Sequence, residues 1–225
     1  MKHIQKGLEP QKFAEWKALA NEDWQPSYNL LSGSEKKAVK TALMTEQGFI
    51  CCYCERRLTD ADSHIEHLQP QNMAGVDPLD FANMLCSCQK NLYPGKPRHC
   101  GNLKGEWYDY DLLVSPLDSN CETRFAFLAN GEILPGYSTD DGASETITRL
   151  GLGIPKLNAL RRKAIEPFLD PELSIEDVTL FAQGYLQPDT EGMFAEFFTT
   201  IRYLFVASPA TNWPNLDGKI FELKK

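Results

Sequence analysis

The crowding of the cysteines is the feature that most constrains this chain. All of its seven cysteines except Cys121 lie between residues 48 and 110, among Gly and Pro turns and short apolar runs. Cys51 and Cys54 are spaced C-x2-C, which allows two thiolates from one tight turn to bind the same tetrahedral ion. Because the start MKHIQKGLEPQ lacks an apolar signal core, we expect a cytoplasmic, reducing location, where cysteines are metal ligands or buried thiols more often than disulfides.

A second pair of cysteines decides what the C-x2-C pair does, because redox-active pairs have the same spacing. Cys88 and Cys100 supply that pair, with Cys86 as the alternative to Cys88. The sequence therefore predicts a structural zinc ion held by Cys51, Cys54, Cys88 and Cys100. Four sulfur ligands leave no position for water, so this zinc would stabilise the fold and do no chemistry. The cysteines expected to be buried small apolar side chains are Cys52, Cys86 and Cys121.

The overall composition is that of an ordinary globular protein. The chain has 225 residues, 42% hydrophobic and 24% charged, which suits one large domain or a small one with helical extensions. Its net charge of −8 excludes a generic basic nucleic-acid coat, so contact with nucleic acid would require a local basic patch or a partner's surface. No apolar run reaches about 18 residues, so no membrane-spanning helix is predicted.

Helical patterns flank the cysteine-rich segment, and the expected fold class is α+β, mainly helical. Residues 1–47 are predicted to form two helices, over PQKFAEWKALAN and over SGSEKKAVKTALMTEQG. Ser32 and Glu35 fit a capping box for the second of these, and Gly48 stops it. Residues 48–110 are expected to form a metal-binding unit with a short hairpin and one small helix.

Residues 111–225 are predicted to be mostly helical. Helices are expected over IPKLNALRRKAIEPFLD, SIEDVTLFAQGYL and EGMFAEFFTTIRYLFV, and the last is apolar nearly all round, which predicts burial. Asn130 and Gly131 lie between apolar runs and signal a hairpin. Basic residues expected on the polar face of the first of these helices are Arg161, Arg162 and Lys163.

The run SHIEH carries the reactive side chains. On a strand, His64 and Glu66 point to one face and His67 to the other. Glu66 is suited to bind a hard divalent cation through oxygen, and a neutral His67 is suited to take a proton from water. The alternative is a half-buried strand with two hydrogen-bonded histidines.

The order of motifs around this run resembles that of a known family. A C-x2-C pair is followed by EHLQP, then by DFANMLCSC and CGNLKG. This order is similar to that of the HNH endonucleases, whose zinc-stabilised ββα-metal core cuts phosphodiester bonds, and most of all to the PtuB family. The resemblance covers about Cys51 to Gly105 and implies an HNH core over residues 48–110, with Cys88 and Cys100 as the second zinc pair.

The resemblance implies a role for each matching residue. His67 matches the general base, and Glu66 matches the acid that binds a catalytic Mg²⁺ or Mn²⁺ ion. Asn83 matches the Asn that holds the site loop and orients the base. Lys104 matches a basic residue that contacts substrate phosphate.

The resemblance also implies partners, because PtuB is the nuclease partner of an ABC/SMC-like ATPase in Septu anti-phage systems and in some retron systems. The implied partners are a PtuA-like ATPase, a nucleic acid and, in a retron, the reverse transcriptase with its RNA–DNA.

The sequence departs from the family pattern at the third HNH slot. That slot is Gly101, which has no side chain to bind metal. Asn102, His99 and His64 are the alternatives for the second ligand of the catalytic ion, and His64 is counted among the catalytic candidates because it shares the strand face of Glu66.

Charge is locally favourable for a phosphate backbone. Residues 81–105 contain no Asp or Glu, and they carry Lys90, Lys96, Arg98 and Lys104. We expect Lys90 and Arg98, like Lys104, to contact substrate phosphate. Two other functions compete with the nuclease: a zinc-stabilised binding module with a degenerate nuclease site, which Gly101 favours, and a thiol oxidoreductase using the C-x2-C pair. The sequence leaves open whether the substrate is DNA or RNA.

Overall fold

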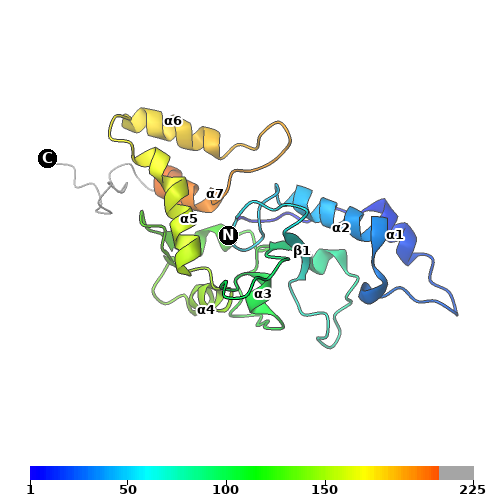
Figure 1. The fold of residues 1–225 in the computed structure, drawn as a ribbon. Helices are drawn as coiled ribbons and strands as arrows, with labels where there is room; N and C mark the ends of the chain where they lie inside the picture. The colour runs from blue at the N-terminus through cyan, green and yellow to red at the C-terminus, as the bar shows by residue number, and fades with distance from the viewer. Residues whose placement is uncertain (208–225) are drawn as a thin grey trace.

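The computed structural model describes residues 1–207, and the end of the predicted C-terminal helical region, 208–225, lies outside the described residues. The N-terminal helices lie on one side of the molecule, the C-terminal helices on the other, and the cysteine-rich segment between them (Figure 1). The helices and strands are α1 (Gln11–Lys17), α2 (Gly33–Glu46), β1 (Ser63–His67), β2 (Met84–Cys88), α3 (Gly101–Lys104), β3 (Phe125–Phe127), β4 (Ile133–Pro135), α4 (Asp141–Arg149), α5 (Pro155–Ile165), α6 (Ile175–Tyr185) and α7 (Phe198–Arg202).

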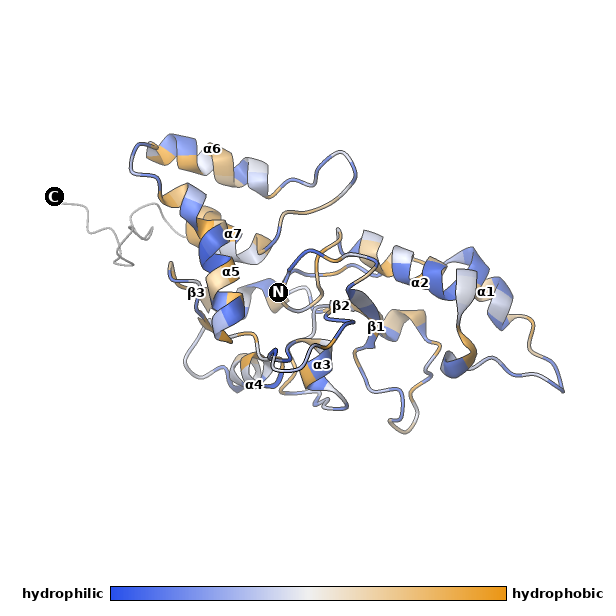
Figure 2. Ribbon diagram, in the orientation of Figure 1, coloured by the Kyte–Doolittle hydropathy of each residue, from blue (hydrophilic) through white to orange (hydrophobic). Residues whose placement is uncertain are grey.

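Two small two-stranded sheets accompany these helices, so the predicted mixture of helices with little strand is confirmed. In the first sheet β1 and β2 are antiparallel, with His67 opposite Met84 and Ser63 opposite Cys88. All five residues of β2 are buried, whereas β1 is mostly hydrophilic (Figure 2). The connection between the strands spans residues 68–83, which is longer than the short hairpin that was predicted. Within residues 1–207, β1 pairs only with β2 and keeps one free edge.

Helix α2 packs on this sheet and confirms the second predicted N-terminal helix. Its buried residues, Val39, Leu43 and Met44, face the strands. Ser32 is the N-cap residue, but its side chain accepts no hydrogen bond from the helix, so the predicted capping box is not formed. Gly48 follows the end of the helix with φ of +59°, a conformation that favours glycine.

The predictions for the C-terminal half of the chain are confirmed in part. The hairpin around Asn130 and Gly131 is present as β3 and β4, and α5 begins at Pro155 as predicted. The helix expected over residues 191–206 is wrong in its first half. Helix begins only at Phe198, after Phe197 adopts the left-handed conformation, and it continues into a π-helical stretch, Tyr203–Ala207. Helix α4 was not predicted.

Arg161 corrects another expectation, because it does not lie on a polar helix face. It is 2% exposed, and its guanidinium donates to the carbonyl oxygens of Leu152 (2.8 Å) and Gly131 (3.3 Å). The buried cation thereby joins α5 to the turn between β3 and β4. Arg162 and Lys163 are exposed, as predicted.

The segment before α7 joins the cysteine-rich segment to the C-terminal half. The buried Glu55 carboxylate accepts hydrogen bonds from the backbone N–H (2.9 Å) and hydroxyl (2.6 Å) of Thr199. The backbone N–H of Phe194 donates to the Gly48 carbonyl oxygen at 3.0 Å. Buried apolar residues from all three predicted segments, 1–47, 48–110 and 111–225, form one cluster. No helix among the described residues is long and apolar enough to cross a membrane.

Gly48 allows a test of this packing. A Cβ atom at Gly48 would overlap the ring of Phe194, 2.8 Å from its Cε2, in addition to the left-handed backbone. We expect Gly48→Ala to lower the free energy of unfolding by about 2 kcal/mol or more in urea denaturation. Gly184 is the matched control: it lies in α6 with open space around it, so Gly184→Ala should raise stability by about 0.5–1 kcal/mol. Equal effects of the two substitutions would contradict this account.

Candidate active site

Four cysteines meet at one buried point. Cys51 and Cys54 come from the turn after α2, Cys88 ends β2, and Cys100 precedes α3. Their sulfur atoms all lie within 4.8 Å of one another, and Cys54 Sγ is 3.7 Å from Cys88 Sγ. A tetrahedral zinc with Zn–S bonds of about 2.3 Å requires sulfur separations of about 3.8 Å. The donor set therefore fits a closed zinc site.

The backbone around these cysteines is unusual. Among residues 1–207 only five non-glycine residues have positive φ, and they include Glu55, Gln89 and Cys100. Glu55 follows Cys54 directly, and Gln89 follows Cys88. Such conformations persist only where the surroundings impose them. In addition, the backbone N–H of Cys88 points at Cys51 Sγ at 3.4 Å.

The alternative ligand, Cys86, lies outside the group. It is one strand repeat, about 6.6 Å, before Cys88 on β2. Its thiol is buried, and its sulfur is not among the four that lie within 4.8 Å of one another. Cys52 and Cys121 are buried, as the sequence predicts.

Glu66 is held by its neighbours through one oxygen. Its Oε1 accepts a hydrogen bond from the Tyr53 hydroxyl (3.2 Å) and forms an ion pair with the Lys104 ammonium (3.1 Å). Its Oε2 faces His64, whose Nε2 is 3.7 Å away. The two oxygens thus have different surroundings, one bound by internal donors and the other directed toward a histidine.

Gly101, the glycine in the third HNH slot, lies against this pair. A Cβ atom at Gly101 would overlap Glu66 Oε2 and lie 3.0 Å from His64 Nε2. The absence of a side chain is therefore what allows His64 and Glu66 to approach each other here. His64 Nδ1 is buried and finds no hydrogen-bond partner among the described residues.

The other two alternatives for the second metal ligand point elsewhere. The Asn102 amide donates to the Gln89 carbonyl oxygen at 2.5 Å. His99 is fully buried with Nδ1 3.1 Å from Cys100 Sγ, and burial lowers its pKa to about 4. Of the three alternatives, His64 is the one whose ring nitrogen lies next to the Glu66 carboxylate.

His67 is fixed by a backbone carbonyl and an aromatic ring. Its Nε2 lies 3.0 Å from the Pro78 carbonyl oxygen, and its ring meets Tyr28 edge-on with centroids 4.6 Å apart. Because a carbonyl only accepts, Nε2 carries the hydrogen and Nδ1 carries the lone pair of the neutral ring. Burial lowers the pKa of His67, whereas the Pro78 hydrogen bond and the charge of Glu66 raise it. Burial has the larger effect, and the lowered pKa favours the neutral ring.

Asn83 closes the loop that supplies this carbonyl. Its side chain accepts from the Gln69 N–H (2.8 Å) and donates to the Gln69 carbonyl oxygen (2.9 Å). Pro78 lies within the loop that Gln69 and Asn83 delimit. The Asn side chain therefore holds together the two ends of the loop whose carbonyl binds the histidine.

Lys104 corrects the expected set of phosphate contacts. It is 3% exposed, and besides its ion pair with Glu66 it donates to the His67 carbonyl oxygen at 3.0 Å. As the last residue of the four-residue α3, it faces the sheet and not the surface. Lys90 and Arg98 are exposed, as a phosphate contact requires.

A pocket of about 270 Å³ opens over Glu66 and His67. The sequence did not point to Tyr28, Tyr53 or Pro78, which orient these two side chains. Pro78 acts through its carbonyl, so no side-chain pattern reveals it. Tyr53 lies inside the run CCYC, where the cysteines dominate the pattern. The residues that line the pocket are Tyr28, Ile65, Glu66, His67, Pro70, Gln71, Asn72, Gly101, Gly105 and Glu106.

Comparison with known proteins supports the resemblance to HNH endonucleases. No protein-family model matches the chain. The chain is similar to a protein of Vibrio cholerae serotype O1 biovar El Tor named "Retron Vc95 putative HNH endonuclease". The two are 32% identical over 139 residues, which is 58% of this chain and 65% of that protein. The similarity thus spans less than two thirds of the relative's length.

Metal analysis tests the cysteine cluster. We expect about one zinc per purified chain, lost in Cys88→Ser and retained in the matched variant Cys86→Ser, because only the former removes one of the four gathered sulfurs. Elemental analysis after dialysis measures this. A wild-type chain without zinc but with reactive thiols would favour the thiol oxidoreductase instead.

A double-mutant cycle tests the place of Lys104. Its side chain is 1% exposed and that of Glu66 is 9% exposed. Removing one partner of such a pair leaves a buried charge, so Lys104→Met should lower the free energy of unfolding by about 3–5 kcal/mol. Adding Glu66→Gln should recover much of that loss in urea denaturation. Lys90→Met, at an exposed site, is the control, and a loss for Lys104→Met no larger than for this control would refute the assignment.

Proposed function

We propose that this chain is a metal-dependent HNH endonuclease that hydrolyses phosphodiester bonds in nucleic acid. The observation that carries the proposal is the joint presence of Glu66 and His67 in one pocket, beside a buried cluster of four cysteines. The similarity to a protein named as an HNH endonuclease supports it. The antiparallel pair of β1 and β2, followed by the short α3, is compatible with a ββα unit.

His67 is the general base in this proposal. Nδ1 of its neutral ring takes a proton from water, and the resulting hydroxide attacks the phosphorus. The Pro78 carbonyl holds the ring in the required tautomer, and Tyr28 limits its rotation. Asn83 contributes indirectly, since it holds the loop that carries Pro78.

Glu66 Oε2 and His64 Nε2 are the groups that would hold a divalent ion, Mg²⁺ or Mn²⁺. When bound, such an ion supplies positive charge that stabilises the phosphate and the leaving 3′ oxygen. Lys104 and Tyr53 hold the other Glu66 oxygen and so orient the carboxylate. In this proposal His64, on the strand, takes the place that a side chain at Gly101 has in the family.

The second candidate function is a zinc-stabilised binding module with a degenerate nuclease site. The observation in its favour is that Lys104 already neutralises Glu66, which weakens the attraction of that carboxylate for a metal ion. The surroundings of Gly101 weigh against the binding module. A histidine in the third slot would overlap Glu66 in its present position, so the glycine is a condition for the arrangement of Glu66 and His64 and not a sign of a lost site.

We infer that the nuclease acts as the effector of an anti-phage defence complex with an ABC/SMC-like ATPase, as in PtuB of Septu systems. The relative's name places that protein in a retron, which supports a defence context. In a retron-linked system the reverse transcriptase and its RNA–DNA would be further partners. At the salt concentration of the cell, a net charge of −8 gives the chain little affinity for free nucleic acid, so the partner would supply most of the binding there.

Nicking assays with the ATPase partner test the proposed chemistry. We expect Mg²⁺- or Mn²⁺-dependent cutting of plasmid DNA or RNA, reduced by about 100-fold or more in His67→Ala, because the general base is lost. Zinc content should be unchanged, and His3→Ala, which changes a histidine outside the pocket, should cut as the wild type does.

The outcomes separate the two candidate functions. Cutting by His67→Ala at the wild-type rate would show that another group activates the water. A wild-type chain that retains zinc but cuts no substrate with either metal would favour the binding module.

A further inference from the structure

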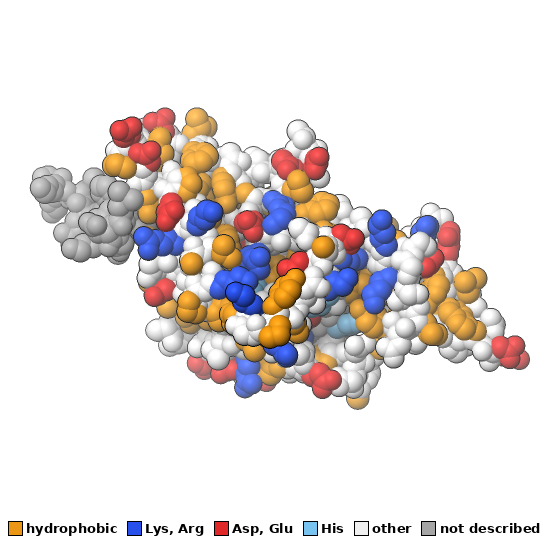
Figure 3. Space-filling view, in the orientation of Figure 1, with side chains coloured by type: hydrophobic (Ala, Val, Ile, Leu, Met, Phe, Trp, Pro, Cys, Tyr) orange, Lys and Arg blue, Asp and Glu red, His pale blue; other side chains and the backbone are white. Residues whose placement is uncertain are grey.

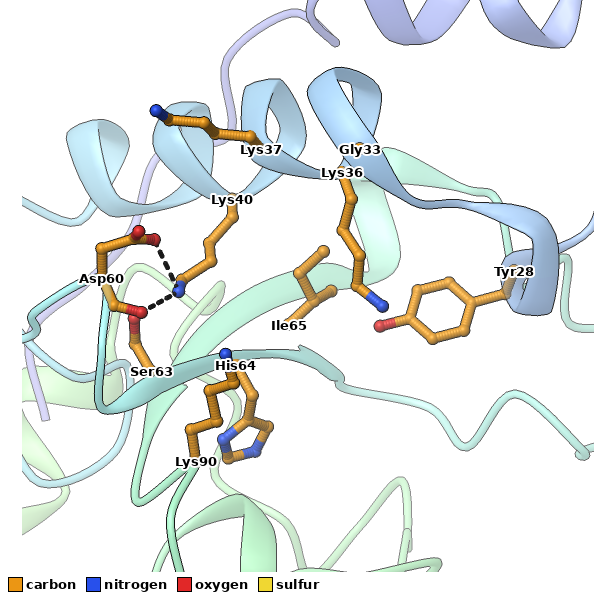
Figure 4. Close-up of a pocket in the computed structure, with 10 residues that line it drawn as sticks. All are labelled: Tyr28, Gly33, Lys36, Lys37, Lys40, Asp60, Ser63, His64, Ile65 and Lys90. Atoms are coloured by element: carbon orange, nitrogen blue, oxygen red, sulfur yellow. Dashed lines mark hydrogen bonds and ion pairs between the residues drawn. The ribbon is translucent and has the colours of Figure 1, made fainter.

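A second groove adjoins the pocket over Glu66 and His67, and of its lysines the sequence pointed only to Lys90. We propose that it binds the phosphate backbone of the nucleic acid on one side of the scissile phosphate. This inference deepens the proposed nuclease function and rests on it. The groove has a volume of about 330 Å³ and is lined by Tyr28, Gly33, Lys36, Lys37, Lys40, Asp60, Ser63, His64, Ile65 and Lys90 (Figure 4).

The groove gathers lysines from two distant parts of the chain. Three come from α2, and Lys90 comes from the loop after β2, fifty residues beyond Lys40 in the sequence. Lys and Arg side chains also gather in the middle of the face shown in Figure 3. On a chain with a net charge of −8, such a concentration of positive charge is a local exception suited to a polyanion.

Part of this charge is free of ion pairs and available to a ligand. Lys36 and Lys90 form no ion pair with any residue in the part of the chain described. Lys40 is paired with the Asp60 carboxylate at 2.8 Å and also donates to the Asp60 backbone carbonyl oxygen at 2.5 Å, so its charge is already engaged. Four lysines against one aspartate leave a formal charge of +3 among the lining residues other than His64.

The groove continues into the candidate active site along the free edge of β1. Ser63, His64 and Ile65 line the groove, and Ile65, Glu66 and His67 line the pocket. From Ser63 to His67 the strand extends over about 13 Å. This length corresponds to about four steps of a duplex strand at about 3.4 Å each. With the duplex axis along β1, phosphates beside Ser63 would lie within about four nucleotides of those beside His67.

Tyr28 stands at the junction and lines both cavities. Its ring meets His67, and Lys36 Nζ lies 5.2 Å from the centroid of the same ring. In Figure 4 the Lys36 amino group points into the groove toward Tyr28, whereas Lys37 points away from it. Lys36 and His67 thus contact the same ring, and Lys90 and His64 both line the groove.

Nucleic acid fits this groove better than an acidic protein segment does. A groove that served only a protein partner would not need to open onto His64 and the Glu66–His67 pocket. The lining lacks groups arranged for reading base edges, and lysines recognise backbone phosphates without regard to sequence. The groove therefore explains affinity and positioning and makes no prediction of sequence preference.

Binding measurements on the full chain in a His67→Ala background test the proposal without cleavage. Fluorescence anisotropy with a labelled DNA duplex, a single-stranded DNA and an RNA hairpin at about 50 mM salt should show Lys36→Glu/Lys90→Glu binding about tenfold or more weakly. The slope of log Kd against the logarithm of salt concentration should be smaller for this double variant than for the parent by about 1.4 to 1.8, as expected for two lost phosphate contacts.

Two further variants separate the groove from general electrostatics. Arg162→Glu/Lys163→Glu changes the net charge equally on the exposed side of α5 and should change binding much less. Asp60→Asn removes the competing carboxylate and should tighten binding about twofold to fivefold.

The proposal that the groove binds nucleic acid would be rejected by either of two results. One is that both double variants weaken binding equally, and the other is that the parent binds none of the probes. Either result leaves the nicking assay to decide the nuclease function by itself. Conversely, groove-dependent binding without nicking would retain the groove and reject the chemistry.

Discussion

The gathering of four thiols at one buried point is the constraint on which the rest of the site depends. It joins the turn after α2, the end of β2 and the start of α3, three segments separated by up to about fifty residues of sequence. Helix α3 has only four residues and could not persist by itself. Anchored at Cys100, it presents Gly101 and Lys104 to Glu66. The C-terminal half reinforces the same turn through Glu55 and Thr199.

The two strands of the first sheet contribute differently to the molecule, β2 to the buried support and β1 to the candidate active site. Strand β2 is wholly buried and carries Cys88 of the sulfur cluster, while β1, which has a free edge, carries His64, Glu66 and His67. An open strand edge gives a linear ligand room to lie alongside it. The same edge therefore accounts both for the pocket over Glu66 and His67 and for its continuation into the lysine-lined groove.

Local patterns in the sequence predicted the parts of the fold that depend on local chemistry. The C-x2-C spacing, the Asn130–Gly131 turn and the proline-led start of α5 each involve neighbours along the chain, and each is present. Lys104 and Arg161 were misplaced because lysine and arginine are exposed by default, and only tertiary contacts reveal a buried partner. Gly101 was read as a defect for the same reason, since its value lies in the space it leaves for Glu66.

The hydrogen bond between His67 and the Pro78 carbonyl has a consequence for how such sites are recognised. The group that sets the tautomer of the ring belongs to the main chain, so any residue at position 78 with the same backbone path supplies it. Chains that share this device can therefore differ freely in the side chain at that position. What they must share is the loop geometry, which here depends on the paired hydrogen bonds of Asn83. A comparison of side chains alone would overlook the residue that orients His67.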